Sequence, residues 1–378
     1  MTGPRPSFTV GIEEEYFLVD RETRDLVADM PEGLMEACED IVEGIVSPEF
    51  IRSQIEIGTP VAENILEVRE HLARLRRDVS NVADDYGMAI ISASTHPFAQ
   101  WGQQRHTDKE RYNMLAEAMQ GVVRRLLVSG MHVHVGIEDN DTRIDLMNQV
   151  LYFLPHILAL STSSPFFGGV DTGLKSYRTT VFRSLPRTGL PDEFQDWAEY
   201  ERHISVLIKA GVIEDPTRLW WDVRPSARYP TLEMRASDIC TRLDDGITIA
   251  ALFMSLLAML SRLRQNNQRW RVYSRTLIDE NVWRAQRYGI SESLIDFGRR
   301  KLVPFPRLVD EIIGLVRQDA TELGCITYVE NARGILERGT SADRQVVIYQ
   351  RAVDSGAEPR EALIEVVDFL IDETVAGL

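Results

Sequence analysis

Short stretches of alternating hydrophobic and polar residues recur along the chain. This alternation is typical of a β-strand with one buried face, because successive side chains of a strand point to opposite sides. The clearest predicted strands are residues 9–19, 53–60 and 129–137. Their polar positions place Glu13 and Glu15 together on one face, Glu56 on the polar side of the second strand, and His132 and His134 on that of the third.

A second charged region follows later in the chain. Residues 219–238 predict a β-hairpin with its turn at 225–230 and a polar inner face. That inner face carries Asp222, Arg224, Glu233 and Arg235. An arginine beside a carboxylate can also be a structural ion pair, and this alternative stays open for Glu233 with Arg235 and for Asp222 with Arg224.

Apolar residues at steps of three and four predict amphipathic helices packed on a core. The predicted helices are residues 31–43, 62–86, 141–163, 246–263, 280–289, 341–354 and 359–375, and residues 88–94 predict a buried strand. The charged side of the 62–86 helix, which includes Arg76, is expected to face solvent. The 246–263 segment is nearly all apolar but too short to cross a bilayer comfortably, so it predicts a central core helix. No linker or repeat interrupts the chain, and we expect one domain over residues 1–378.

The composition narrows the class of protein. A chain of 378 residues with 44% hydrophobic content can bury a sizeable core. The net charge of -16 argues against a nucleic-acid or membrane partner, and the first residues lack an apolar run typical of a signal peptide, so we expect a cytoplasmic location.

The three cysteines lack the spacing of a metal site; they are Cys38, Cys240 and Cys325. For Cys240 a reactive thiol is one alternative and a small buried hydrophobic side chain is the other, and the second is favoured.

Two loops add candidate binding residues. His96 follows the 88–94 strand and precedes a proline, so it lies on a loop at the sheet end and is either a substrate contact or an ordinary loop residue. The glycine-rich stretch 164–178 is predicted to be an irregular rim, where Lys175, Arg178 and the nearby Arg183 could supply positive charge for phosphate. For each of these cations, solvation at the surface is the alternative.

The polar strand faces together suggest a metal site. Two carboxylates on one face persist together when a cation neutralises them, when one keeps its proton, or when water surrounds them, as on a solvated edge strand. The inward set combines many carboxylates with one or two imidazoles, which suits Mg²⁺ or Mn²⁺ better than zinc and implies more than one ion. Metals beside arginines are what phosphoryl transfer from a nucleotide requires. The sequence has neither a P-loop nor a dinucleotide fingerprint, so the nucleotide would be held through its metals.

Six motifs in order give the chain a family resemblance. The motifs are G-I-E-E-E-Y at Gly11, T-H-P-F at Thr95, G-M-H-V-H-V-G at Gly130, D-T-G-L-K-S-Y-R at Asp171, P-T-L-E-M-R at Pro230 and N-V-W-R-A-Q-R-Y-G at Asn281. With them the chain resembles the carboxylate–amine ligase family, also called glutamate–cysteine ligase type 2, over about Phe8 to Gly289.

The resemblance implies a glutamine synthetase-like α+β fold, in which an antiparallel sheet forms a funnel for ATP and metals and helices pack on its outer face. It implies an ATP-dependent, ADP-forming ligase that joins an amino-acid carboxylate to an amine through an acyl phosphate, with glutamate and cysteine as one substrate pair. By the family pattern, the metal ligands are Glu13, Glu15, Glu56, His132 and Glu233. The remaining expected site residues are Arg235, Arg224 and Asp222 for catalysis, and His96, Lys175, Arg178, His134, Asn281 and Arg287 for substrate or nucleotide binding.

Two other functions fit part of the pattern. A metal-dependent amide hydrolase could use His132 and His134 with a carboxylate to activate water, and it predicts turnover without a nucleotide. A non-catalytic descendant would bind a nucleotide or an amino acid without releasing ADP. The sequence leaves the oligomeric state open, with a homodimer as one option.

Overall fold

The computed structural model describes residues 5–41, 44–121 and 126–378. Its main sheet has seven strands, with β10-β11-β5-β1-β3-β2 in order and β4 paired with β1. Every pairing within this sheet is antiparallel. The strands are β1 (Val10–Asp20), β2 (Ile45–Pro48), β3 (Gln54–Gly58), β4 (Met88–Ile91), β5 (Met131–Gly136), β10 (Val223–Pro225) and β11 (Thr231–Met234). This mixed α+β architecture with an antiparallel sheet agrees with the prediction from the sequence.

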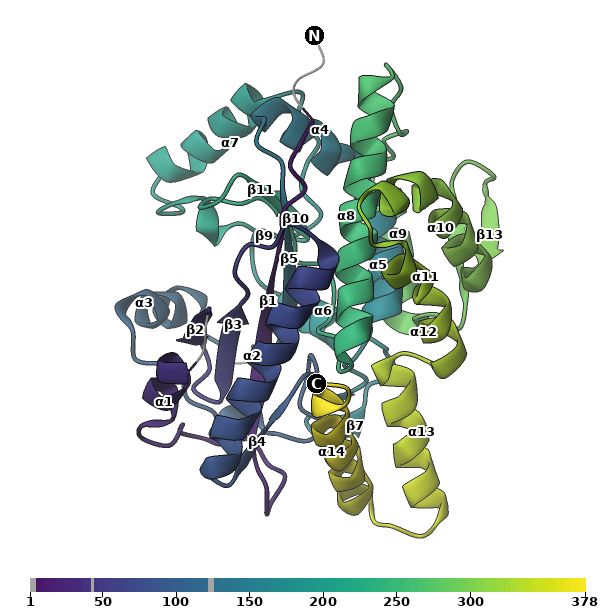
Figure 1. Cartoon of the computed structure of the whole chain (residues 1–378). Coiled ribbons are helices and arrows are strands. Elements are labelled where there is room, and N and C mark those ends of the chain that lie inside the picture. Colours follow the sequence, from purple (N-terminus) through teal and green to yellow (C-terminus); the bar gives the residue numbers. More distant parts are fainter. Residues whose placement is uncertain (1–4, 42–43, 122–125) are drawn as a thin grey trace.

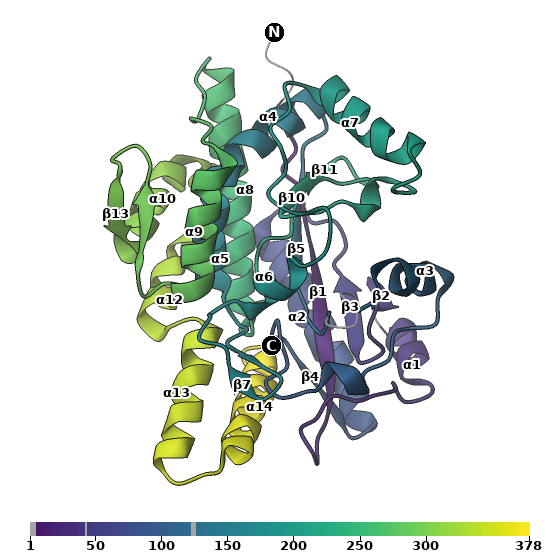
Figure 2. The same cartoon turned by 180° about the vertical axis from the view of Figure 1, so that it is seen from behind.

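The long strand β1 runs through the centre of the sheet. Its residues pair with β3 along one edge and with β5 and then β4 along the other. In Figure 1 the helix α2 (Ile65–Asp85) crosses in front of β1, and in Figure 2 the strands lie in front of α2. Helix α2 therefore covers one face of the sheet and leaves the opposite face for the site described below.

The remaining elements surround this sheet. The other strands form small pairs: β6 (Phe166–Phe167) with β7 (Val170–Asp171), β8 (Thr188–Gly189) with β9 (Trp220–Trp221), and β12 (Ser293–Asp296) with β13 (Lys301–Pro304). The helices before residue 220 are α1 (Leu34–Ile41), α3 (Glu110–Met119), α4 (Asn140–Val150), α5 (Leu154–Ser161), α6 (Tyr177–Phe182) and α7 (Trp197–Lys209). Those after it are α8 (Leu243–Gln265), α9 (Arg275–Tyr288), α10 (Phe305–Glu322), α11 (Ile326–Glu330), α12 (Ala332–Arg338), α13 (Ser341–Asp354) and α14 (Pro359–Val375). Short 3₁₀ turns occupy Trp101–Gln103, Leu151–Phe153 and Pro216–Arg218.

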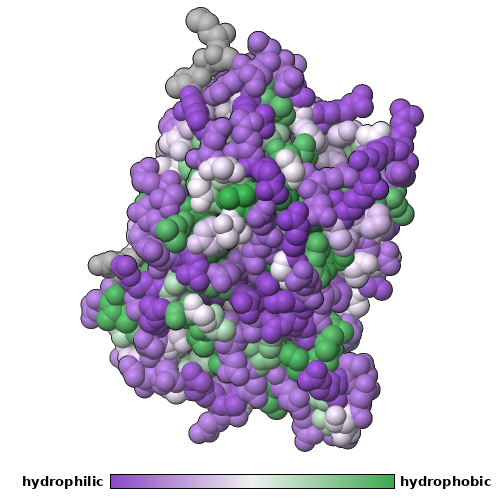
Figure 3. Space-filling view, turned by 45° about the vertical axis from the view of Figure 1, so that its right-hand side comes forward, coloured by the Kyte–Doolittle hydropathy of each residue, from purple (hydrophilic) through white to green (hydrophobic). Residues whose placement is uncertain are grey.

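Helix α8 is the central core helix that the sequence predicts. By length and composition it could span a membrane, but 89% of its most apolar window is buried inside the protein. Its apolar residues from Leu243 to Leu260 pack in the main hydrophobic cluster. The face of the molecule in Figure 3 is mostly hydrophilic, with hydrophobic side chains in small scattered groups. The apolar run of α8 is therefore accounted for by the core.

Most predicted elements are present with shifted ends. The predicted helix 141–163 is divided into α4 and α5 by a 3₁₀ turn, and the predicted rim 164–178 contains the small β6–β7 pair. The predicted helix 31–43 corresponds to α1, and its last two positions, 42–43, lie outside the described residues. The sequence analysis did not predict α3, α7 or α10. The single-domain organisation stays a prediction.

One prediction about α2 is wrong. Arg76, expected on a solvated face, is fully buried and forms an ion pair with Glu14, with Nη2 2.6 Å from Oε1 and Nε 2.8 Å from Oε2. Tyr16 also donates a hydrogen bond to Glu14 Oε2 at 2.6 Å. Glu14 points to the α2 side of β1, opposite to Glu13 and Glu15, so it needs a buried cation of its own. The three cysteines are all buried and free, as favoured from the sequence.

Candidate active site

A polar cleft of about 300 Å³ opens on the sheet face that α2 does not cover. Its floor is formed by side chains of β1, β3, β5, β10 and β11, and its walls by residues of α6, β9 and the segments around residues 45–50 and 226–229. The floor carries Glu13, Glu15, Glu56, His132, His134, Arg224, Glu233 and Arg235. The structure thus brings all five predicted metal ligands into one cleft.

The strand register explains this convergence. Glu15 pairs directly with Glu56, Glu13 with His132, His134 with Glu233, and Glu233 with Arg224. Directly opposed residues point to the same face of a sheet, with Cβ atoms about 5 Å apart. A row of charged side chains therefore runs across β3, β1, β5, β11 and β10.

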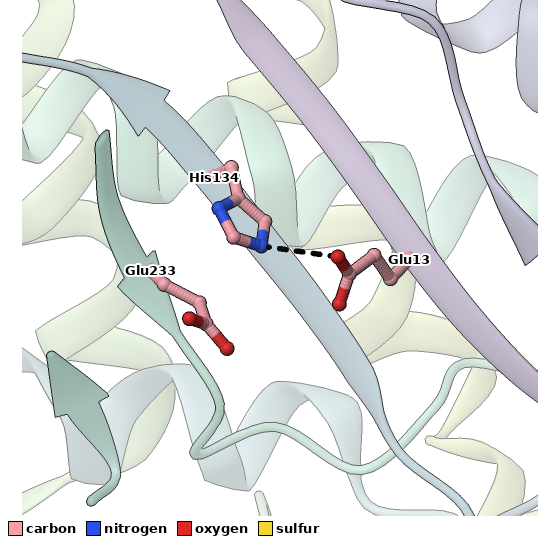
Figure 4. A group of neighbouring side chains, drawn as sticks. All are labelled: Glu13, His134 and Glu233. Carbon is pink, nitrogen blue, oxygen red and sulfur yellow. Dashed lines mark ion pairs between the residues drawn. The ribbon is translucent and has the colours of Figure 1, made fainter. Parts of the chain in front are cut away.

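The first group of candidate ligands is Glu13, His134 and Glu233 (Figure 4). One ligand atom from each lies within 4.8 Å of the others. His134 Nδ1 is hydrogen-bonded to Thr231 Oγ1 at 3.0 Å, whereas the buried Nε2 has no hydrogen-bond partner in the part of the chain that the structure describes and lies 3.4 Å from Glu13 Oε1. A buried imidazole nitrogen without a partner, facing carboxylates, fits a divalent cation. The sequence analysis placed His134 among the substrate-binding residues, and the geometry places it in this group.

His132 stands between the two carboxylates of β1. Its Nδ1 lies 2.9 Å from Glu13 Oε2 and 3.2 Å from Arg235 Nη1, and its Nε2 lies 3.8 Å from Glu15 Oε1. Burial and the charge of Arg235 lower the pKa of His132, which favours the neutral ring that can bind a metal. Burial raises the pKa of Glu13, but His132 and His134 outweigh it and hold this pKa well below its usual range. Glu13 is therefore ionised and ready to accept a cation.

The second group is Glu15, Glu49 and Glu56, again with ligand atoms within 4.8 Å of one another. Burial and Glu49 raise the pKa of Glu15, and the same two causes raise the pKa of Glu56 further. Carboxylates this close repel each other when ionised, so without a cation some keep their protons. A divalent cation would replace those protons, and oxygen-only ligands suit Mg²⁺ or Mn²⁺.

Glu49 was not predicted from the sequence. It directly follows β2, which pairs with β3, and its backbone nitrogen donates to Gln54 O at 3.4 Å. Continuation of the hairpin by one residue puts its side chain on the same face as Glu56. The sequence analysis missed Glu49 because it did not predict strand β2, and without that strand nothing indicated on which face the Glu49 side chain lies.

Glu233 is held by two guanidinium groups. Arg224 donates to both of its oxygens, at 2.9 and 3.0 Å, and Arg235 Nη1 lies 2.6 Å from Oε1. Burial raises the pKa of Glu233, but Arg235 and Arg224 outweigh it and lower this pKa. The ion pair of Glu233 with Arg235, one alternative from the sequence, is thus present. Together with the pair of Glu233 and Arg224 it keeps both arginines on the cleft floor, beside the first group of ligands.

Sequence comparison supplies the family. The family model described as glutamate–cysteine ligase family 2 matches residues 9–368. The chain belongs to this family. Relatives provisionally named glutamate–cysteine ligase 2 include one from Rhodospirillum rubrum, which is 59% identical over 99% of this chain and 97% of its own length. Another, from Paracoccus denitrificans, is 51% identical over 97% of this chain and 98% of its own length.

Solved structures of low sequence identity share the fold. The glutamate–cysteine ligase of Francisella tularensis, solved in complex with AMP, is similar at a TM-score of 0.68 and 12% identity, over all of this chain and 90% of that one. The bifunctional glutathione synthetase of Pasteurella multocida is similar at 0.69 and 13% identity, over 97% of this chain and 52% of that one. The predicted glutamine synthetase-like α+β class is confirmed for this member of glutamate–cysteine ligase family 2.

Four predicted binding residues of this family member lie away from the cleft. His96 is buried and bonds within its own loop and to Arg24 O, and Lys175 forms an ion pair with Asp343 at 2.7 Å. The amide of Asn281 bonds the backbone of Ile295, and Arg287 bonds the carbonyl of Gly173. These four side chains bond loops and helix ends in the structure, and their contact with substrate stays a prediction.

Asp222, expected among the catalytic residues, is also outside the cleft lining. Its carboxylate lies 2.9 Å from Nη2 of Arg183. The Nη1 atom of the same arginine lies 3.0 Å from the carboxylate of Asp279. The structural ion pair weighed for Asp222 therefore exists, but its partner is Arg183 instead of Arg224. Arg178, in contrast, lines the cleft, and its expected contact with a substrate or nucleotide stays a prediction.

Proposed function

We propose that this protein is an ATP-dependent, ADP-forming ligase that joins a carboxylate to an amine in an amide bond of γ-glutamyl type. One observation carries the proposal: two groups of candidate metal ligands and several arginines share one cleft. Membership of the glutamate–cysteine ligase family supports the reaction class. Glutamate and cysteine are the substrate pair to test first, with magnesium or manganese.

The candidate ligands divide into two cation positions. Glu13, His134 and Glu233 would hold one ion, Glu15, Glu49 and Glu56 would hold another, and His132 lies between them. Bound divalent cations would neutralise the phosphates of ATP and fix the orientation of its terminal phosphoryl group. The five carboxylates of the two groups supply the negative charge that two divalent cations would need.

The reaction we propose has two steps. An oxygen of the substrate carboxylate attacks the terminal phosphorus of ATP, the bond from that phosphorus to the bridging oxygen breaks, and ADP leaves with an acyl phosphate formed. The amine nitrogen then attacks the acyl carbon, inorganic phosphate leaves with its carbon–oxygen electron pair, and the nitrogen loses one proton. In both steps negative charge builds up on phosphate oxygens: on the transferred phosphoryl group and ADP in the first, and on the leaving phosphate in the second.

The arginines of the floor are placed to stabilise that charge. Arg235 and Arg224 reach Glu233 with part of their donors, and the buried Nε of Arg235 has no hydrogen-bond partner within residues 5–41, 44–121 and 126–378. A preorganised donor at a developing oxyanion contributes several kcal/mol in a water-poor site. We assign Arg235 to the transferred phosphoryl group, with Arg224 in support.

The two other functions are weaker fits. A hydrolase needs one metal-bound water near its imidazoles, whereas this cleft adds an all-carboxylate group suited to magnesium or manganese. A non-catalytic protein has no use for half-buried carboxylates that repel one another, because such a cluster costs stability. The observations therefore favour the ligase.

ADP release across a panel of amino acids and amines, with Mg²⁺ or Mn²⁺, tests the proposal. We expect release that requires a metal, an acid and an amine together, and we expect Glu13→Gln to abolish it in a folded protein. Turnover of an amide without nucleotide would favour the hydrolase, and binding of ATP without ADP release would favour the non-catalytic protein.

A further inference from the structure

A buried carboxylate behind the cleft wall organises the loop that carries Arg178. Asp238 is fully buried, and its backbone pairs with Gly130 at the start of β5. Its Oδ2 accepts hydrogen bonds from the backbone nitrogen of Ser163 at 2.9 Å and the hydroxyl of Ser164 at 2.7 Å, and its Oδ1 accepts one from the hydroxyl of Ser176 at 2.7 Å. Asp238 therefore fastens both ends of the segment 163–176 to the sheet.

This attachment reaches Arg178 directly. The backbone nitrogen of Arg178 donates to Ser164 Oγ at 3.1 Å, and Ser164 Oγ in turn donates to Asp238. The side chain of Arg178 continues past Gly130 into the cleft. A Cβ atom at position 130 would lie 2.7 Å from Arg178 Nη2, so glycine leaves the room that the guanidinium occupies.

The guanidinium of Arg178 is poorly compensated. The residue is 4% exposed, its Nη2 donates to the carbonyl of Arg235 at 3.2 Å, and its buried Nε has no hydrogen-bond partner among the described residues. Within the described residues, no carboxylate lies in ion-pair distance of it. The guanidinium carbon lies over the aromatic ring of Phe182, 5.2 Å from the ring centroid. A buried cation is costly unless it is paired, and an arginine fork binds a carboxylate or phosphate with two parallel hydrogen bonds.

Asp238 is not in ion-pair contact with Arg178: its oxygens accept hydrogen bonds from Ser163, Ser164 and Ser176, and its nearby negative charge raises the pKa of that guanidinium only against the larger effect of burial. Its bonds fix where the arginine enters the cleft. Such an arrangement is preorganised for an anion that arrives with the substrates.

We propose that Asp238 is a positioning residue that holds the 163–178 segment so that Arg178 receives an oxyanion of a substrate. The oxyanion is either a carboxylate of the acid or a phosphate of ATP, and the inference rests on the proposed ligase function. Arg178 contacts the ligand, whereas Asp238 acts only through Arg178.

Separate calorimetric titrations with MgATP, L-glutamate and inorganic phosphate test the roles of Arg178 and Asp238 without any turnover. We expect Arg178→Gln to weaken at least one of these three ligands by about tenfold or more, and the identity of that ligand tells carboxylate from phosphate. Asp238→Asn should weaken the same ligand, and the double variant should bind no worse than Arg178→Gln alone. If none of the three ligands is weakened, or if the two losses add in the double variant, the proposal is wrong.

Two further variants separate positioning from a general loss of structure. Asp343→Asn removes the ion pair of Lys175 on the outer side of the same segment and also weakens the cap that Asp343 forms with Thr340 at the start of α13; ligand binding should nevertheless stay within about twofold of the wild type. Gly130→Ala keeps Asp238 and displaces the guanidinium, so it should reproduce the Arg178→Gln loss even if Asp238→Asn does not fold. Unchanged binding by Gly130→Ala would overturn the placement of Arg178. ADP release by the wild type tests the ligase function separately.

Discussion

Glu14 and Glu56 provide a matched pair of carboxylates for the most informative stability experiment. Glu14 is fully buried and Glu56 is half-buried, and both become uncharged amides in the variants Glu14→Gln and Glu56→Gln. Glu14 is ionised against Arg76 on the α2 side of the sheet, whereas Glu56 faces the cleft among other carboxylates. The same chemical change should therefore have opposite consequences on the two faces.

The magnitude for Glu14 follows from its contacts. The change removes a charge that two nitrogens of Arg76 and the hydroxyl of Tyr16 bond at 2.6 to 2.8 Å, and it leaves Arg76 buried without a counter-ion. Loss of one partner of a buried pair costs about 3–5 kcal/mol. For a chain of 378 residues, an unfolding entropy of about 0.8 kcal/mol/K converts the middle of this range to a fall in Tm of ~5 °C.

Glu56 should behave differently in metal-free buffer. Burial and Glu49 raise its pKa, so the folded state disfavours the ionised form that the unfolded chain adopts at neutral pH. Since a raised pKa means that ionisation at neutral pH costs the folded state free energy, the neutral amide should leave the unfolding free energy unchanged or raise it. The variant should nevertheless lose metal-dependent ADP release.

Urea unfolding with a chelator, followed by circular dichroism and tryptophan fluorescence, measures both variants. We expect a large loss for Glu14→Gln and little or none for Glu56→Gln. Equal losses, or a loss below about 1 kcal/mol for Glu14→Gln, would refute the assignment of these glutamates to two different environments.

Three other predictions concern the cleft and its surroundings. Arg235→Lys should lower kcat by roughly 10²-fold with little change in the Kd for ATP, because one ammonium cannot reproduce the forked contact; equal loss in both quantities would indicate a structural ion pair. Glu49→Gln should weaken Mg²⁺ or Mn²⁺ binding by about tenfold or more, measured by metal titration, whereas unchanged affinity would remove Glu49 from the ligands. Cys240→Ala should keep full ADP release, because burial raises the pKa of this thiol well above its usual range and keeps it unreactive; loss of activity in a folded variant would contradict that.

The strand periodicity predicted the floor of the site well. Alternation alone separates Glu13 and Glu15 from Glu14, and it puts His132 and His134 on one face. It does not reveal which strands are neighbours, so the pairing of Glu15 with Glu56 and of His134 with Glu233 appears only in the sheet register.

The failures have a different physical origin. Arg76 follows the helical pattern of a solvated residue, and only the tertiary position of Glu14 across β1 makes it a buried partner. His96, Lys175 and Asn281 belong to motifs of the family, but their side chains satisfy backbone groups or a nearby carboxylate. Motif membership therefore does not distinguish a residue that contacts substrate from one that shapes the loops around it.

The central claim is that the cleft activates a carboxylate with ATP. It is tested most directly by incubating the protein with ATP, magnesium, an amine and L-glutamate whose carboxylates carry the heavy stable isotope of oxygen, and by measuring the released phosphate by mass spectrometry. The account predicts one labelled oxygen in each phosphate, because the attacking oxygen stays on phosphorus when the amine displaces it. Amide product accompanied by unlabelled phosphate would contradict the account.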